Sequence, residues 1–178
     1  MATLTRRWLY NFFMNISNIT DNKMKRTYKI TSSFMISILL IIFSLSYAHA
    51  DYASAKIDFD ERRFEEAFKG FTQAAEQGDM MSQYYLGVMY ATGRTLARDD
   101  VNAFKWFMKA AQQGHAISQG NIGTMKLNAR GTDHDINGSF YWFILAEDGG
   151  FEKARKFMWR VTNYMSREDI NNIQAKAD

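Results

Sequence analysis

The sequence predicts an all-α protein that folds as an α/α solenoid, a row of tandem helix pairs with a period of about 36 residues. One observation is that small and aromatic residues recur 36 positions apart. A second is that each unit holds two stretches with the apolar spacing of amphipathic helices. The recurring sets include Phe71, Phe107 and Phe143; Ala74, Ala110 and Ala146; and Gly78, Gly114 and Gly150.

The first helix of a unit is predicted over residues 80–91. Its apolar or small residues follow the i, i+3, i+4, i+7, i+8 spacing of one helix face, and Gly93 offers a C-cap. These residues are Ser82, Tyr85, Leu86, Met89 and Tyr90. After the loop 92–98, Asp99 or Asp100 can cap the next helix with its carboxylate.

The second helix is predicted to end at Gln113–Gly114, and Asp135 repeats the cap of Asp99 in the next unit. In the second helix of the first unit, the expected buried residues are Val101, Ala103, Phe104, Phe107, Ala110 and Ala111. Small residues such as Ala74, Gly87 and Gly123 would let neighbouring helices approach closely. We interpret Trp106 and Trp142 as packing anchors, because aromatic residues at fixed repeat positions usually belong to the core.

Residues 51–178 form one predicted domain, since no proline or low-complexity linker divides them. Ser166 is the expected N-cap of a last helix, which carries Ile170, Ile173 and Ala177 on one face. The expected parts are a degenerate helix pair over 51–77 (helices 52–59 and 64–76), repeats over 78–113 and 114–149, and a C-terminal cap over 150–178.

Residues 24–50 have the pattern of a secretory signal peptide. Three basic residues between positions 25 and 29 precede an apolar run over 34–45, and Ala48-His49-Ala50 follows. We therefore expect cleavage between Ala50 and Asp51. The apolar run is shorter than the roughly 20 residues of a membrane span, but no charge lies between Lys29 and Asp51, so an uncleaved anchor is the alternative.

A signal peptide that begins at Met24 has an ordinary length, whereas one that begins at Met1 would have 50 residues. Our hypothesis is that residues 1–23 are a non-native or unusual extension. Residues 1–50 carry six basic residues and one acidic residue, so the chain's net charge of +3 leaves −2 for residues 51–178. This balance argues against nucleic-acid binding, and the absence of cysteine excludes a disulfide framework.

The residues at fixed offsets resemble the Sel-one-like repeat family, a relative of the tetratricopeptide repeat. Its pattern of A-A-x-x-G, L-G, Y, G, D and A-x-x-W is matched over about residues 64–159. The matching residues are Ala74, Gly78, Leu86, Gly87, Tyr90, Gly93, Asp99, Ala103, Trp106, Ala110 and Gly114, then Gly123, Asp135, Trp142, Ala146 and Gly150. The resemblance implies a right-handed superhelix that binds proteins or assembles complexes. We expect no cofactor.

The chain departs from that pattern at three kinds of position. Each loop keeps one glycine of the family's G-x-G-V, and Lys126 replaces the tyrosine. Trp159 stands where Gly87 and Gly123 stand in the earlier copies, which suits a terminal capping unit.

Asp133-His134-Asp135 is the cluster that most resembles a metal or acid–base site. We interpret Asp135 as a helix cap, and no second histidine is expected near His134, whereas a catalytic zinc takes three protein ligands. Two pairs of adjacent acids, Glu65–Glu66 and Glu147–Asp148, diverge on their helices. Ser118, close in sequence to His115, occupies the small packing position of the repeat. The sequence therefore predicts no catalytic residue, no metal site and no enzyme.

Residues that do not recur are better candidates for binding, because repetition marks packing. On the first helix of each unit such residues are expected to lie off the buried face and to line a groove. The candidates for partner binding are Gln83, Tyr84, Val88, Gln119, Thr124 and Arg160.

We expect an exported bacterial module, periplasmic or secreted, that displays a rigid helical surface to a protein or peptide partner in the cell envelope. One alternative is a hydrolase that acts on envelope material. Another is an assembly factor anchored in the inner membrane, which differs only in whether residues 34–50 stay attached. A membrane is an expected partner only in that last case, and nucleic acid in none.

Overall fold

The computed structural model describes residues 35–39 and 51–177, which belong to two units, 1–44 and 45–178. Residues 35–39 are helical. No helix in the described ranges is long and apolar enough to cross a membrane. The predicted extension 1–23, Ala50 and the rest of the signal peptide over 24–50 lie outside the described residues, so the leader and its cleavage remain predictions.

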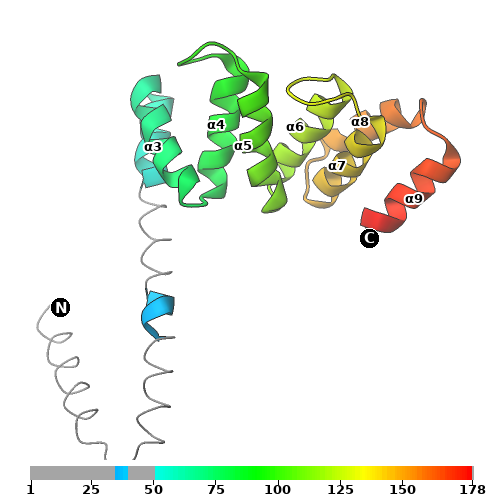
Figure 1. Cartoon of the computed structure of the whole chain (residues 1–178), viewed down its shortest axis with the longest axis horizontal. Helices are drawn as coiled ribbons and strands as arrows, with labels where there is room; N and C mark the ends of the chain where they lie inside the picture. Colours follow the sequence, from blue (N-terminus) through cyan, green and yellow to red (C-terminus); the bar gives the residue numbers. More distant parts are fainter. Residues whose placement is uncertain (1–34, 40–50, 178) are drawn as a thin grey trace, which may run out of the picture. The chain divides into compact units, whose positions relative to one another are not determined.

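The second unit is a row of helices laid side by side, and the predicted all-α solenoid is confirmed (Figure 1). From α3 to α8 each helix packs mainly on those that precede and follow it in sequence, as expected for a repeat array, whereas α9 packs mainly on α7. Residues 51–60 are helical, and the helices that follow are α3 (Phe64–Glu76), α4 (Met80–Thr92), α5 (Asp100–Gln112), α6 (Ala116–Leu127), α7 (Ile136–Asp148), α8 (Lys153–Thr162) and α9 (Arg167–Ala177).

Aspartates begin three of the helices. The Asp99 carboxylate accepts a hydrogen bond of 2.9 Å from the backbone N–H of Asn102, and Asp135 accepts one of 2.7 Å from Gly138. Asp79 does the same for α4, a cap that the sequence analysis did not assign. At the last helix, the Ser166 hydroxyl accepts from the backbone N–H of Asp169 at 3.1 Å, as predicted.

The glycines that close each unit have a backbone conformation that other residues avoid. Gly78, Gly114 and Gly150 have φ angles of +95°, +92° and +91°. A Cβ at any of them would meet no atom within 4 Å, so the conformation alone requires glycine there. The 36-residue glycine repeat therefore marks the sharp turn between units.

The glycines inside the first helices have a different role. A Cβ at Gly87 would lie 2.5 Å from the Phe107 ring, and one at Gly123 would lie 2.6 Å from the Phe143 ring. The recurring alanines 74, 110 and 146, on the second helices, are fully buried. These small residues let the second helix of a unit place its phenylalanine directly on the first helix.

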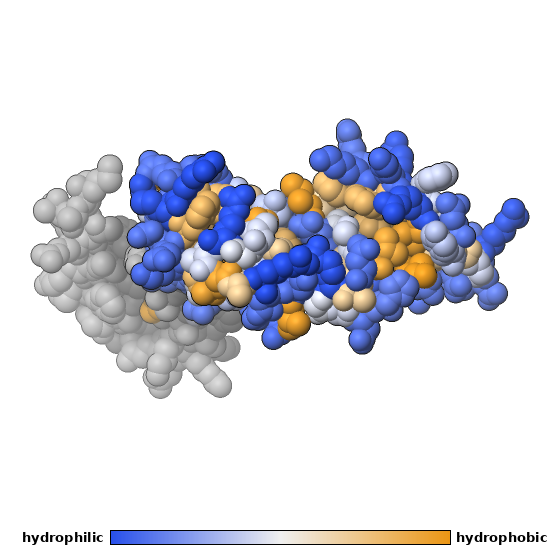
Figure 2. Space-filling model, turned by 90° about the horizontal axis from the view of Figure 1, so that it is seen from above, coloured by the Kyte–Doolittle hydropathy of each residue, from blue (hydrophilic) through white to orange (hydrophobic). Residues whose placement is uncertain are grey.

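Val101 was expected in the core, and that prediction is wrong because its side chain is 52% exposed. Consecutive helical residues are about 100° apart, so Val101 lies opposite the buried face of Ala103 and Phe107. Trp106 and Trp142 are half-buried, and each packs against the apolar cluster of the preceding unit. On the face shown in Figure 2, apolar side chains gather in separate patches within a hydrophilic surface.

Candidate partner-binding groove

A hollow of about 270 Å³ opens between α4 and α6, the first helices of two successive units. We call it the α4–α6 groove. Three predicted partner-binding residues line it, namely Tyr84, Val88 and Thr124. The other lining residues are Ala91 and Thr92 from α4, Phe107 from α5, Ile117, Asn121 and Met125 from α6, and Arg130 from the next loop.

Tyr84 forms a rigid aromatic wall of the groove. Its ring centroid lies 4.7 Å from that of His115 and 6.1 Å from that of Phe107. Burial raises the pKa of the Tyr84 hydroxyl, with a smaller contribution from Tyr85, so this side chain is neutral at physiological pH. Because Gly120 stands one period after Tyr84, the facing helix has no side chain at the corresponding position.

Arg130 brings a positive charge to the edge of the groove. Its Nη2 lies 2.7 Å from Oδ1 of Asp100, and Nη2 of Arg98 lies 2.7 Å from Oδ2 of the same carboxylate. Hydrogen bonds from Arg98 and Arg130 hold the pKa of the Asp100 carboxyl well below its usual range. These contacts join the loop after α6 to the start of α5, so the groove edge is fixed across two units.

Thr124 presents a methyl group and an acceptor to the groove. Its hydroxyl donates a hydrogen bond of 2.9 Å to the Gly120 carbonyl oxygen, so the lone pairs of that hydroxyl remain for a partner's N–H. Val88 and Ile117 supply aliphatic surface, and Ile117 is 42% exposed.

A second hollow, of about 230 Å³, lies one unit further along, between α6 and α8. We call it the α6–α8 hollow, and Arg160, another predicted partner-binding residue, lies on its wall. Tyr164 lines it as well and is 79% exposed. The remaining lining residues are Leu127, Asn128, Val161 and Asn163.

Gln83 and Gln119 are not surface residues, and the prediction that they lie off the buried face is wrong. Gln83 is 4% exposed and Gln119 is 7% exposed. Each side-chain amide donates a hydrogen bond of 3.2 Å to a backbone carbonyl of the preceding helix, from Gln83 to Ala75 and from Gln119 to Ala111. The signal for this role was in the sequence, because the two glutamines themselves recur at the 36-residue period.

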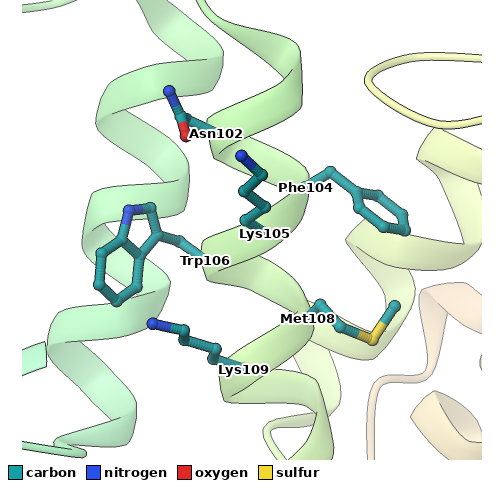
Figure 3. A pocket seen from close by; sticks show the side chains of 6 residues that line it. All are labelled: Asn102, Phe104, Lys105, Trp106, Met108 and Lys109. Carbon is teal, nitrogen blue, oxygen red and sulfur yellow. The ribbon is translucent and has the colours of Figure 1, made fainter. Parts of the chain in front are cut away.

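A further hollow, of about 350 Å³, lies along α5 and is lined by that helix alone (Figure 3). Trp106 and Lys109 lie on one side, with Lys109 Nζ 3.9 Å from the indole centroid, while Phe104 and Met108 point toward the other. Side chains that diverge around one helix do not converge on a ligand. This place is therefore a weaker candidate than the α4–α6 groove.

His115 and Ser118 do meet, but not as an accessible catalytic pair. His115 Nδ1 lies 2.8 Å from Ser118 Oγ, and Ser118 is fully buried. Burial also lowers the pKa of His115, which disfavours the charged imidazolium. No substrate reaches this hydroxyl in the arrangement observed.

The acidic candidates are dispersed. Asp135 caps α7 and pairs with Lys126 at 2.9 Å, while Asp133 and His134 are exposed in the loop. Glu147 pairs with Arg155. Within the described ranges no three His, Asp or Glu side chains are grouped as metal ligands.

Solved structures with the same fold support this description. A protective antigen of uropathogenic Escherichia coli, c5321, described as displaying an SLR fold, matches with a TM-score of 0.67 and 22% identity over 73% of this chain. The match covers 29% of that chain, so this chain spans under a third of its length. A Sel1 repeat protein from Oxalobacter formigenes matches with a TM-score of 0.60 and 25% identity, covering 70% of this chain and 98% of the other. No curated protein matches.

The Sel1 repeat family matches residues 63–79, 81–115 and 116–151, which together include both first helices that line the α4–α6 groove. Repeats of this family generally mediate contacts between proteins and are typically non-catalytic. The matched repeats and the shared fold show that the chain is a Sel1-like repeat protein.

Proposed function

We propose that the protein is an exported adaptor that holds a segment of a partner protein in the α4–α6 groove. The observation that carries this proposal is that Tyr84, Val88 and Thr124, from two successive repeats, line one hollow that neither repeat forms alone. Residues that differ between repeats thus meet at one place, which is how a repeat scaffold acquires specificity.

The chemistry of the groove favours a peptide segment with an apolar side chain. Tyr84 and Val88 provide aromatic and aliphatic contact area, and Asn121 and Thr124 provide polar groups that can pair with a peptide backbone. Arg130 at the edge favours an acidic residue or a C-terminal carboxylate on the partner, although its ion pair with Asp100 weakens that preference.

Site-specific photo-crosslinking in the producing bacterium tests the groove. A photoreactive residue at Val88 or Thr124 is expected to give the same discrete protein adduct. The matched control position is Gln73, which is exposed on α3, a helix that contributes none of the lining residues of the groove described above. Adducts that are absent at 88 and 124, or identical at 73, would contradict the proposal.

The export part of the proposal rests on the signal-like pattern of residues 24–50. It is tested by the N-terminal peptide of the native protein in fractionated cells. A start at Asp51 in the soluble envelope fraction would support a periplasmic or secreted adaptor. A start at Met24 or Met1 in the membrane fraction would instead support an anchored assembly factor.

A further inference from the structure

A large apolar side chain is exposed near each end of the helix row. Terminal units of repeat proteins normally present a polar outer face, because no neighbour covers them. Here Ile57, in the helix over 51–60, is 56% exposed, and Trp159 on α8 is 69% exposed. These two helices lie toward opposite ends of the row (Figure 1).

The exposure of Trp159 follows from how the array ends. In the preceding units the equivalent positions are Gly87 and Gly123, each covered by a phenylalanine of the following helix. After α8 the chain instead places α9 mainly against α7, and Ile173 is buried in the cluster that contains Phe143. The outward face of α8 is therefore left without a covering helix in the described part of the chain.

The sequence around Trp159 is basic. Residues 152–164 hold four basic residues and one acidic residue, a net charge of +3. Among the described residues Lys153, Lys156 and Arg160 form no ion pair, and Arg155 remains 80% exposed although it pairs with Glu147. Near this end of the row, the exposed side of α8 thus carries an aromatic residue among basic residues.

The opposite end has the reverse charge. Residues 51–66 hold six acidic and three basic residues, a net charge of −3. The exposed face of the helix over 51–60 follows helical spacing and consists of Ala53, Ser54, Ile57 and Asp60, with Glu61 just beyond. The side chains of Asp60 and Glu61 are 60% and 54% exposed although they pair with Lys56 and Arg63. The exposed face at this end therefore carries an aliphatic residue, Ile57, beside the acidic residues Asp60 and Glu61.

We propose that copies of this chain associate head to tail, with the Ile57 face of one copy against the Trp159 face of the next. The two faces each carry an exposed apolar side chain, and their net charges are opposite. Tryptophan is among the residue types most enriched at the hot spots of protein interfaces. The contact joins two different surfaces, so it is heterologous and generates an open chain or a ring of copies. It uses a surface separate from the α4–α6 groove.

Sedimentation equilibrium and light scattering test this on the protein purified after expression of the full chain. Mass is expected to rise with concentration, and to fall when salt is raised to about 1 M, where charges are screened within about 3 Å. Ile57→Arg and Trp159→Glu are each expected to weaken association about tenfold or more. Leu96→Arg is the matched control, since Leu96 is also 51% exposed but lies at neither end.

Mixing the two variants decides the geometry. The Ile57→Arg chain keeps its α8 face and the Trp159→Glu chain keeps its N-terminal face, so the mixture is expected to form dimers through these two intact faces. Circular dichroism of each variant checks that its helices are intact. A protein that stays monomeric up to about 0.5 mM, a concentration at which millimolar dissociation constants are visible, would overturn the proposal. So would association that neither variant weakens, or a mixture that does not form dimers.

Discussion

The Gln113 side-chain amide donates a hydrogen bond of 2.8 Å to Oε1 of Gln83, which is buried in α4. Gln113 also donates to the Gly78 carbonyl oxygen at 3.1 Å, and Gln83 donates to that of Ala75 at 3.2 Å. One chain of amides thus connects α3, α4 and α5. Sequence-adjacent helices of a solenoid are joined here by side chains as well as by apolar packing.

The next unit has only half of this connection. Gln119 repeats the bond of Gln83, but Gly149 stands one period after Gln113. Among the described residues, Gln119 Oε1 is buried without a hydrogen-bond partner. A Cβ at position 149 would lie 2.8 Å from the Ala116 Cβ, so the close helix approach there leaves no room for a glutamine. At the second junction, residues 116 and 149 therefore lie close together, and among the described residues the side-chain carbonyl of Gln119 has no donor.

Substitution of the two glutamines is expected to have unequal effects. Gln113→Ala leaves the buried Gln83 oxygen without its donor, at a cost of about 1–2 kcal/mol of unfolding free energy. Gln83→Ala also opens a cavity and removes the donor to Ala75, for a cost of about 2–3 kcal/mol. Urea denaturation measures both, with Gln112→Ala as control because that side chain is exposed. Equal losses for Gln83 and Gln112 would contradict the role of the amide chain.

The backbone conformation predicts opposite effects on stability for substitutions at two positions. Gly114→Ala forces a Cβ into positive φ and is expected to lower the unfolding free energy by about 1–2 kcal/mol. Ala129 already has a φ of +52°, so Ala129→Gly is expected to change stability little or to raise it by up to about 1 kcal/mol. Thermal unfolding of the two variants compares them directly. A stabilising Gly114→Ala would show that the turn conformation is not the reason for the repeated glycine.

The caps give a third prediction, because Asp99 accepts from Asn102 at both the backbone N–H and the side-chain amide. Asp99→Ala is expected to cost about 1 kcal/mol, and Asp99→Asn much less, since asparagine is an equally good N-cap. Asp135→Ala is expected to cost more than Asp99→Ala, because Asp135 also pairs with Lys126. Urea unfolding of the three variants, which does not screen the ion pair, should give the largest loss for Asp135→Ala and the smallest for Asp99→Asn. A large loss for Asp99→Asn would mean that charge matters more than the cap.

The fold could be predicted because the residues that determine it recur. Positive φ at Gly78 and its equivalents, and helix contact at Gly87 and Gly123, restrict the residue type at each repeat, and such restrictions appear as periodicity. The helix start at Asp99 and the face of Ile173 followed from local capping and spacing rules in the same way.

The groove could be predicted only in part. Tyr84, Val88 and Thr124 were identified because they vary between units, but their meeting depends on how far α4 lies from α6, which helical spacing does not encode. Gln83 was misplaced because a polar side chain was assumed to seek solvent, whereas the carbonyl of Ala75 is within its reach. Whether these residues bind a partner remains a prediction.

The His115 ring gives the protein a pH dependence of known sign. Burial against Tyr84 lowers its pKa in the folded state below that of a free histidine, so folding favours the neutral ring. The folded state therefore binds fewer protons here than the unfolded state, and this contribution to stability is full above about pH 6.5 and is lost as the pH falls below it.

His115→Gln, which cannot titrate, is expected to flatten the stability profile between about pH 5 and 7. His134→Gln is the control, because His134 is exposed in the loop before α7. Urea midpoints measured across this range should fall with acid in the control and the parent protein but not in His115→Gln, and parallel profiles for all three would show that protonation of His115 is not linked to folding.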